Sequence, residues 1–359
     1  MTQRTTLAAF RRSIPVLALS LALFACSDDK NNGNNDDSPS PSVTLNPSTI
    51  KASGDTLLVT LQRLENWAAT KPGLLVRIKA STKTVIDTIQ LNFYNPSSSV
   101  LSNGKLYVSL QGAYNEDYSI DVAKSGIAVV DLATGTSKVL VKGTELGGGA
   151  GDIALDEANQ ILYASVSVSF GNSPVKPIDL AAKTVGDALP NISNASGGLV
   201  FDKEGKKLFV GDRSSGLIVY DVLANTTTIV DNQDPLLLPY SLSATNSLLL
   251  NFTSDYTTGE LRWMDLNSTT LSGALTFNQD SKVYATGENI FFFERNPGTL
   301  ACISSQNGDV KVITQKRLEA DNPYEVAVIG TKGYITLNDA NYVQILDVGT
   351  CTLSEKIDL

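Results

Sequence analysis

The chain has 359 residues, of which 37 are acidic and 28 basic, and it contains no histidine. The missing histidine excludes Ser-His-Asp and Cys-His catalysis and every metal site that needs a histidine ligand. The formal net charge of −9, with no basic cluster after the N-terminal segment, argues against a nucleic-acid partner.

Residues 1–25 have the zones of an export signal. Arg4, Arg11 and Arg12 form a basic region, and an apolar stretch follows from Ile14 to Ala25. Twelve residues rise about 18 Å as a helix, which is too short for a hydrocarbon core of about 30 Å. The segment therefore predicts a cleaved signal peptide rather than a membrane span.

Leu23, Ala25 and Cys26 resemble the lipobox of bacterial lipoprotein signals, although Phe24 is bulkier than the residue usual at its position. The resemblance implies that Cys26 becomes the lipidated first residue of the mature chain. It also implies a place in the bacterial cell envelope, at the outer membrane, with the periplasmic or surface face left open. The alternative is an ordinary secretory signal in which the cysteine is incidental.

Residues 26–42 are dominated by Asn, Asp, Ser and Pro. Their low hydrophobicity predicts a disordered tether between Cys26 and a folded domain. The acidic residues directly after Cys26 also resemble the surface-export signals of Bacteroidetes lipoproteins. Residues 43–359 remain for a single large domain.

An internal repeat runs through residues 43–359. One unit consists of an alternating apolar strand, a turn and another strand, and its copies are LLVRIKASTKTVIDTI (74–89), GIAVVDLATGTSKVLV (126–141), VKPIDLAAKTVGDAL (175–189), GLIVYDVLANTTTIV (216–230), ELRWMDLNSTTLSGAL (260–275), TLACISSQNGDVKVIT (299–314) and YVQILDVGTCTLSEKI (342–357). Two further short apolar segments precede each copy, and the units recur every 40 to 56 residues. Four short strands per such period predict an all-β, seven-bladed β-propeller of four-stranded antiparallel blades.

The pieces VVDLATG (129–135) and LYVS (106–109) resemble the YVTN repeats of bacterial seven-bladed propellers. The resemblance covers nearly all of residues 43–359 and implies the fold, but it implies no particular activity because propellers carry many functions. The sequence leaves two ways in which the ring of blades could close. Residues 42–45 either add a strand to the last blade or lead into the first inner strand.

Five of the seven predicted blades also repeat an aspartate at the end of the third strand. These residues are Asp131, Asp179, Asp221, Asp265 and Asp347. A carboxylate that recurs once per blade is expected to accept backbone hydrogen bonds in the blade's own turn rather than to perform chemistry. The GGGAG run at 147–151 lacks the strand-Gly-helix context of a phosphate loop and is expected to be a flexible connection between blades.

Cys302 and Cys351 lie on the sixth and seventh predicted blades. In an oxidising compartment two remaining cysteines form a disulfide, which would join the last two blades, or they stay separate thiols. The strand alignment leaves both possibilities open.

The ends of the seven second strands are expected to gather around one end of the propeller channel. The end residues are all polar, and they are Arg63, Gln111, Ser167, Arg213, Thr253, Arg295 and Asn338. The three arginines suit bidentate recognition of carboxylates or phosphates. The alternative is that they are ordinary polar residues at strand ends.

Aromatic residues are expected in the loops next to these strand ends. They are Trp67, Tyr94, Tyr114, Tyr118, Phe170, Tyr240, Tyr256, Tyr324 and Tyr342. Together with the arginines, they predict a site for an anionic or aromatic ligand, or for a loop of another protein. The ligand-binding residues expected are Arg63, Arg213, Arg295, Gln111, Asn338, Trp67, Tyr94, Tyr114, Tyr240 and Tyr324.

The function expected from the sequence is a non-catalytic, lipid-anchored binding protein with a small ligand or with a partner such as an outer-membrane uptake transporter. No catalytic residue, metal ligand or cofactor is assigned. One alternative is a metal-dependent, lactonase-like hydrolase that uses Glu116, Asp117 or Asp255. The other is a scaffold that binds only proteins.

Overall fold

The computed structural model describes residues 43–231, 238–242, 247–252, 258–266, 270–278, 281–286, 289–306 and 309–359. They belong to one compact unit, Pro41–Leu359. Among these described residues, no helix is both long and apolar enough to cross a membrane. The predicted signal and tether, residues 1–42, lie outside the described part of the chain.

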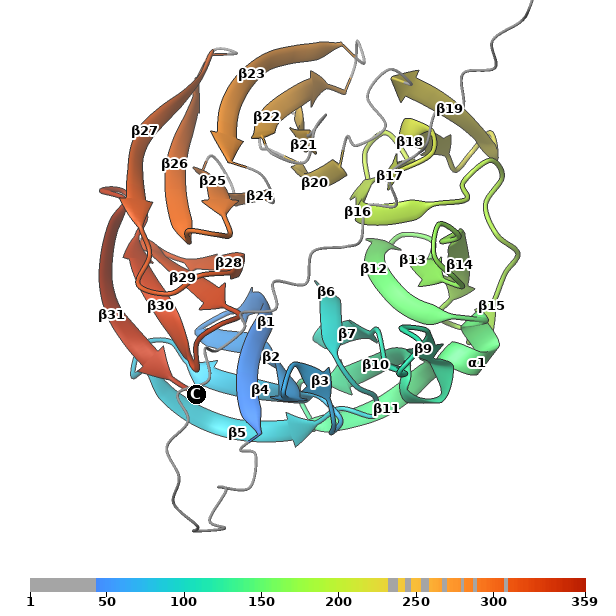
Figure 1. Ribbon diagram of the computed structural model, residues 1–359, viewed down its shortest axis with the longest axis horizontal. Coiled ribbons are helices and arrows are strands. Elements are labelled where there is room, and N and C mark those ends of the chain that lie inside the picture. The colour runs from blue at the N-terminus through green and yellow to red at the C-terminus, as the bar shows by residue number, and fades with distance from the viewer. Residues whose placement is uncertain are drawn as a thin grey trace, which may run out of the picture. The chain divides into compact units, whose positions relative to one another are not determined.

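The structure is an all-β propeller built from four-stranded antiparallel blades (Figure 1). The innermost strands are β1 (Thr44–Ser53), β6 (Pro96–Ser102), β12 (Gly149–Asp156), β16 (Ala195–Asp202), β20 (Leu238–Leu242), β24 (Ser281–Thr286) and β28 (Pro323–Ile329). The second strands are β2 (Thr56–Glu65), β7 (Lys105–Leu110), β13 (Ile161–Ser167), β17 (Lys207–Asp212), β21 (Ser247–Phe252), β25 (Asn289–Glu294) and β29 (Lys332–Leu337).

The remaining strands complete each blade toward the rim. The third strands are β4 (Leu74–Lys79), β10 (Gly126–Asp131), β14 (Val175–Asp179), β18 (Gly216–Asp221), β22 (Thr258–Asp265), β26 (Thr299–Gln306) and β30 (Tyr342–Asp347). The outermost strands are β5 (Thr84–Gln90), β11 (Thr136–Lys142), β15 (Thr184–Val185), β19 (Thr226–Asp231), β23 (Leu271–Asn278), β27 (Asp309–Arg317) and β31 (Thr352–Asp358). Short elements decorate the first two blades: β3 (Ala68–Ala69), β8 (Ala113–Tyr114), β9 (Ile120–Asp121), η1 (Val122–Lys124) and α1 (Gly143–Leu146).

The innermost strands form a closed ring. Each contacts the next in chain order, and β28 contacts β1, as Figure 1 shows. Residues from Thr44 onward pair with β2, so the N-terminal strand is the inner strand of the first blade and adds nothing to the last blade. The second of the two open alternatives for residues 42–45 is therefore the observed one.

Hydrogen bonds join the first blade to the last and close the ring without a shared strand. The Asn46 side-chain amide donates to the backbone oxygen of Asn338 at 2.6 Å. The Thr336 hydroxyl donates to the backbone oxygen of Ser48, also at 2.6 Å. Both bonds connect residues near opposite ends of the chain, so closure depends on polar contacts that are buried between blades.

Apolar residues pack between neighbouring blades because each sheet alone leaves both of its faces exposed. Between the first and second blades, Leu58 and Leu75 pack in one cluster with Leu106, Val108 and Ala128, all of them buried. These are the residues that the alternation in the sequence assigns to the sheet faces. The core is thus distributed around the ring rather than gathered at its centre.

Four of the five recurring aspartates, Asp131, Asp179, Asp221 and Asp347, have the turn role that the sequence predicts. Asp131 Oδ1 accepts from the backbone N–H groups of Ala133 and Thr134 at 3.0 and 2.9 Å. The hydrogen bond from the Thr134 backbone is the main reason that the pKa of Asp131 lies below its ordinary value. Asp179 and Asp221 accept equivalent pairs of bonds, and Asp347 accepts from the Thr350 N–H.

The prediction for residues 147–151 is wrong in part. Gly147 caps the short helix α1 with a φ of 78°, and Gly149 begins strand β12. A Cβ on Gly149 would come within 2.6 Å of Ile120 Cδ1, so glycine lets β9 approach β12 closely. The run is therefore a helix cap and a packed strand rather than a flexible connection.

Arg77 links the first blade to the turn of the second. Its Nε donates to Asp87 Oδ1 at 2.7 Å, and its Nη1 donates to the Leu132 backbone oxygen at 2.7 Å. The hydrogen bonds from Arg77 hold the pKa of Asp87 below its ordinary value. A lowered folded-state pKa means stability that is present above the unfolded value of about 3.9 and lost as the pH falls through the folded value.

We expect Asp87→Asn to lower the free energy of unfolding by about 0.5 kcal/mol at pH 7, because the Asp87 side chain is 40% exposed and solvent screens the pair. The difference from wild type should begin to shrink below about pH 4 and be lost as the pH falls through the lowered folded-state pKa of Asp87, where the wild-type carboxylate becomes protonated. Urea unfolding at pH 7 and pH 3 measures both values. Glu204→Gln, which removes one exposed carboxylate, is the control, and an equal effect from it would contradict a specific role for Asp87.

Candidate ligand-binding cavity

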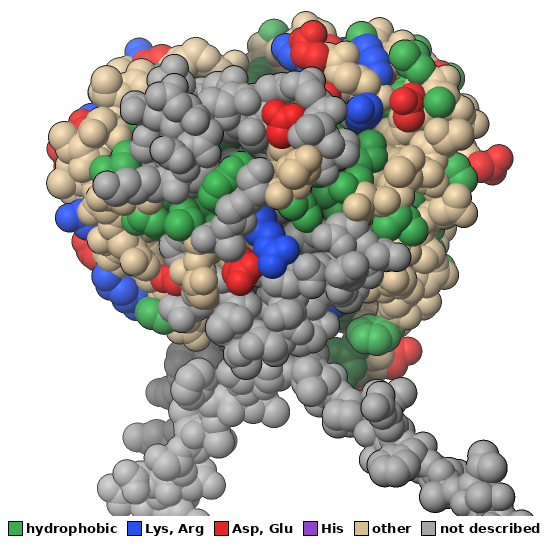
Figure 2. Space-filling view, turned by 90° about the horizontal axis from the view of Figure 1, so that it is seen from above, with side chains coloured by type: hydrophobic (Ala, Val, Ile, Leu, Met, Phe, Trp, Pro, Cys, Tyr) green, Lys and Arg blue, Asp and Glu red, His purple; other side chains and the backbone are tan. Residues whose placement is uncertain are grey.

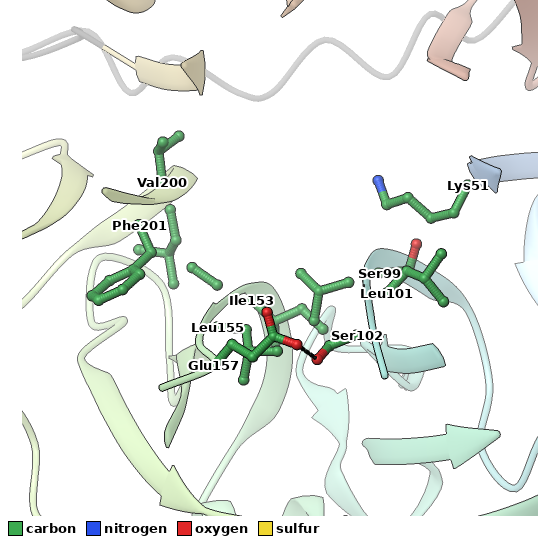
Figure 3. Close-up of a pocket in the computed structure, with 12 residues that line it drawn as sticks. Lys51, Ser99, Leu101, Ser102, Ile153, Leu155, Glu157, Val200 and Phe201 are labelled. Carbon is green, nitrogen blue, oxygen red and sulfur yellow. Dashed lines mark hydrogen bonds between the residues drawn. The ribbon is translucent and has the colours of Figure 1, made fainter. Parts of the chain in front are cut away.

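A cavity of about 480 Å³ lies between the innermost strands of four consecutive blades (Figure 3). Strands β1, β6, β12 and β16 form its walls. Eight of its twelve lining residues are hydrophobic, but polar and apolar atoms contribute equally to its exposed surface. The lining residues are Lys51, Ser99, Val100, Leu101, Ser102, Ile153, Ala154, Leu155, Glu157, Leu199, Val200 and Phe201. The volume lies within the range of small-molecule sites.

Two charged residues stand on different walls of the cavity. Lys51 projects from β1, whereas Glu157 follows β12, as Figure 3 shows. Lys51 is already paired with the buried Glu325 of β28, so its positive charge is matched by a carboxylate beside it. Glu157 Oε1 accepts from the Ser102 hydroxyl and, at 2.8 Å, from the Asn103 side-chain amide.

Glu325 connects the cavity wall to the seam between the last and first blades. It is 8% exposed, and its Oε2 accepts from the Ile50 N–H at 2.8 Å. Its Oε1 accepts from the Lys51 ammonium group. The carboxylate therefore orients Lys51 at the edge of the cavity and satisfies a backbone donor of β1.

Tyr324 and Lys282 cross the channel toward its other end. Tyr324 begins in β28, reaches past β1, and donates from its hydroxyl to the Ser97 backbone oxygen of β6 at 2.9 Å. Lys282 Nζ lies 3.3 Å from the centre of the Tyr324 ring. Ser97 is near the start of β6, whereas the cavity residue Ser102 is at its end. The cavity therefore faces the turns that join first to second strands.

The predicted arginines lie at the opposite end of the channel from this cavity. Arg63 pairs with Leu45 near the start of β1, and its Nη1 donates to the Pro72 backbone oxygen at 3.4 Å. Arg295 Nε donates to the Asn322 side chain at 3.2 Å. Arg213 is exposed just after β17. Each belongs to a different blade, and the two bonded guanidinium groups support neighbouring loops.

Gln111 and Asn338 follow their second strands as expected. The Gln111 N–H donates to the Asn95 backbone oxygen at 2.9 Å. The Asn338 side-chain amide donates to the Pro47 backbone oxygen and to Gln62 Oε1, both at 3.3 Å. Asn338 thus helps to close the ring, and its hydrogen bonds hold strands rather than leave it presented to a ligand.

The predicted aromatic residues occupy three kinds of position. Trp67 is exposed in a turn, as expected, and Tyr114 is exposed at the end of the short strand β8, whereas Lys124 Nζ lies 5.4 Å from the centre of the half-buried Tyr94 ring. The expectation that Tyr240, Tyr324 and Tyr342 lie in loops is wrong, since they belong to strands β20, β28 and β30. A proline beside Tyr240 and Tyr324 suggested a loop, but both prolines are in innermost strands, where a missing N–H is tolerated.

The loop carboxylates do not assemble a metal site in the described part of the chain. There, no group of three or more Cys, Asp or Glu side chains is placed to hold a metal ion. Asp117 instead caps its own turn, since its Oδ1 accepts from the Ser119 N–H and hydroxyl, and the hydroxyl contributes most to lowering the pKa of Asp117. Thr253, Asp255 and Tyr256 lie outside the described residues.

No pattern in the sequence indicated the cavity-lining residues directly. One signal was available: Lys51 and Glu325 are charged residues in otherwise apolar or neutral first strands. A charge on an innermost strand is costly unless it is paired. The two residues therefore could have been matched with each other once the ring was assumed to close.

Known proteins resemble this chain in structure but not in sequence. No family model matches the chain, and no curated protein matches its sequence. Its structure is similar to that of a Bacteroides uniformis protein assigned provisionally as a 6-phosphogluconolactonase, with 14% identity, a TM-score of 0.63, and coverage of 85% of this chain and 97% of that one. The β-propeller domain of Cps50 (Swd1) from Myceliophteria thermophila has 14% identity and a TM-score of 0.58, covering 89% and 98%.

Kuenenia stuttgartiensis hydrazine synthase is similar at 13% identity and a TM-score of 0.57, covering 91% of this chain and 99% of that one. The chain folds as a β-propeller. Sequence identities this low support a shared fold alone, so the activities of these proteins cannot be assigned to this chain.

Proposed function

We propose that the chain is a non-catalytic binding protein that holds a small ligand in the channel cavity and is anchored to the bacterial envelope through Cys26. The observation that carries the proposal is the cavity of about 480 Å³ between β1, β6, β12 and β16. Its volume is in the usual range for small-molecule sites, and its lining combines hydrophobic side chains with Lys51, Ser99, Ser102 and Glu157. The anchor is supported by the Leu23-Phe24-Ala25-Cys26 sequence.

The blade count that goes with this proposal is seven, in a propeller of the YVTN type. It is supported by the separate four-stranded sheets that begin with β1, β6, β12, β16, β20, β24 and β28. Each of these sheets contains one copy of the repeat. The contact between β28 and β1 then accounts for ring closure without an additional strand.

The described walls favour a neutral ligand that has both apolar and polar groups. Lys51 is neutralised by Glu325, and Glu157 adds a negative charge near the mouth. An anion would therefore meet repulsion that no free cation among the lining residues offsets. Ser102 and Glu157 can bind hydroxyl or amide groups at one end of such a molecule.

A thermal-shift screen tests this function on wild type, on Ser102→Trp, and on the Arg63/Arg213/Arg295→Ala triple variant. Ser102 is half-buried at the turn after β6, so a tryptophan there should obstruct the mouth without disturbing the core. The panel contains neutral aromatic and aliphatic metabolites, anionic metabolites, siderophores, corrinoids and metal ions. A ligand at 100 times its Kd should raise the midpoint of wild type by roughly 4 °C.

The variants assign each shift to a site. A shift that Ser102→Trp loses and the arginine variant keeps supports the cavity. A shift that only the arginine variant loses places the site at the other end and contradicts the cavity proposal. If no compound shifts wild type, the protein-binding alternative gains, and co-purification from the envelope, with uptake transporters among the candidates, becomes the next measurement.

A hydrolase is the second candidate, favoured by the similarity to the provisionally assigned lactonase. Asp255, one of its three candidate residues, lies outside the described part of the chain. We expect no metal-dependent hydrolysis of a sugar lactone above the uncatalysed rate, measured by proton release with and without added divalent cation. Metal-dependent turnover that Asp255→Asn abolishes would replace the binding proposal.

A further inference from the structure

Three consecutive blades carry exposed aromatic residues on loops at the same end of the ring. These residues, which we call the aromatic edge, are Trp67, Tyr114, Tyr118 and Phe170, and they are 73%, 54%, 77% and 101% exposed. They lie in the loops after β2, β7 and β13, which are second strands of neighbouring blades. Large aromatic rings are seldom left in water without a partner, and several of them together indicate an interaction surface.

The backbone holds two of these rings outward at an energetic cost. Asn66 and Trp67 form the two-residue turn between Glu65 and Ala68, and both have positive φ, 49° and 65°. A turn of this kind favours glycine at its second position, where this chain has tryptophan. Tyr118 also has a positive φ, 62°, in the loop between β8 and β9. A bulky residue in this region costs about 1–3 kcal/mol, which backbone stability alone does not explain.

The loops of the aromatic edge support one another. Strand β3, directly after Trp67, contacts β8, which contains Tyr114. Strand β9 packs on β12, where a Cβ on Gly149 would meet Ile120 at 2.6 Å. Phe170 and Gly171 form the tip of the next loop, between the paired Ser169 and Asn172. The supports of Trp67 and Tyr114 therefore adjoin each other, and the Phe170 loop is held by its own backbone pairing.

The chain enters the propeller beside the aromatic edge. Thr44 pairs with Leu64, three positions before Trp67, and its hydroxyl donates to the Leu64 backbone oxygen at 3.2 Å. Seventeen residues, 26–42, separate the proposed anchor from Val43. A flexible segment of that length has an r.m.s. span of about 23 Å and a maximum of about 60 Å. The tether therefore brings this end of the ring closer to the bilayer than the other end.

We infer that the aromatic edge contacts the surface of the lipid bilayer in which Cys26 is anchored. Trp and Tyr prefer the boundary between water and lipid, because their rings are apolar and their N–H or O–H groups are polar. Glu116 and Asp117 share the loop of Tyr118, so the contact depends on rings rather than on attraction to anionic headgroups. The inference rests on the proposed anchor and is independent of the cavity.

Charged side chains elsewhere do not offer a competing membrane surface on the side shown in Figure 2. There, acidic and basic side chains are interspersed among hydrophobic and neutral ones. A surface of mixed sign is not drawn to anionic lipid by a field of one sign.

The test uses the fluorescence of Trp67 on vesicle-bound protein. Chain 26–359 is coupled through the Cys26 thiol to a maleimide-headgroup phospholipid in phosphatidylcholine vesicles. Cys302 and Cys351 are bridged, so Cys26 is the single free thiol of the three cysteines. Chemical coupling makes the result independent of whether the cell lipidates Cys26. Trp263→Phe leaves Trp67 as the sole tryptophan of the two in the chain.

We expect the Trp67 emission to move to shorter wavelength and to fall at least twofold when the lipid carries brominated acyl chains. The matched control is Leu223→Trp in a Trp67→Phe/Trp263→Phe background. Leu223 is 82% exposed in the turn between β18 and β19, at the opposite end of the ring, and its signal should be unchanged. If Trp263→Phe fails to fold, the Trp67→Phe protein supplies the Trp263 background for subtraction.

Two results would overturn the inference. Trp67 emission that bromine leaves unchanged would show that the aromatic edge does not reach lipid and needs another partner. Equal quenching of the tryptophan at position 223 would show that the propeller has no preferred orientation. Because every sample is coupled covalently to the vesicle, neither result reflects a failure of anchoring or of ligand binding.

Discussion

Replacing Glu325 with alanine is expected to lower the free energy of unfolding by about 3–4 kcal/mol. The carboxylate is 8% exposed and accepts from both the Ile50 N–H and the Lys51 ammonium group. Its removal leaves a buried backbone donor without its acceptor and a partly buried cation without its counter-charge. These partners are 275 and 274 positions away in sequence, so the substitution weakens the seam that closes the ring.

Urea unfolding of Glu325→Ala, Lys51→Met and the double variant forms a cycle that isolates this pair. Lys51→Met should cost less, since Glu325 keeps its bond to the Ile50 N–H and the Lys51 side chain is 27% exposed. Glu325→Gln should lie between wild type and Glu325→Ala, because an amide oxygen still accepts from Ile50. A cost below 1 kcal/mol for Glu325→Ala would mean that the seam is held by other contacts.

The repeated parts of this fold could be predicted because they are encoded locally. Alternating apolar residues identify the strands, and Asp131 and its counterparts accept hydrogen bonds from residues only two or three positions later. Such features recur in every blade and so appear in the sequence as a period. The sequence left the disulfide between Cys302 and Cys351 as one of two possibilities, because the bond also requires the last two blades to meet.

The candidate site could not be predicted in the same way, because its lining residues come from four blades and meet only when the blades pack around the channel, while Lys51 at its edge is held by a residue of the last blade. The Lys51–Glu325 pair joins the first and last blades, and Tyr324 reaches Ser97 over a separation of 227 positions. Neither pair has a local pattern. The arginines were visible in the sequence as strand ends, but their hydrogen bonds to Pro72 and Asn322 depend on loop conformations that no period encodes.

Removing the disulfide between Cys302 and Cys351 is expected to lower the free energy of unfolding by about 3–4 kcal/mol. It joins β26 to the turn between β30 and β31, with 6.3 Å between the Cα atoms and a sequence separation of 49. In the chain-entropy model a closed loop of that size restricts the unfolded chain by about 4 kcal/mol, and measured values are commonly 2–4 kcal/mol. Both cysteines are buried in the apolar cluster between the last two blades.

Alanine is the suitable replacement at both positions. Alanine places no polar hydroxyl in the apolar cluster. At position 351, where φ is 53°, alanine and cysteine disfavour the positive φ to a similar extent. Cys302→Ala, Cys351→Ala and the double variant should therefore have similar free energies of unfolding, because each loses the same bond. Cys26→Ser is the control and should match wild type, since it leaves the bridge intact.

Urea unfolding with and without a reducing agent provides the second comparison. Reduction should lower the free energy of unfolding of wild type toward that of the double variant, and it should leave the double variant unchanged. Equal stability of wild type and the double variant would mean that apolar packing alone joins these blades.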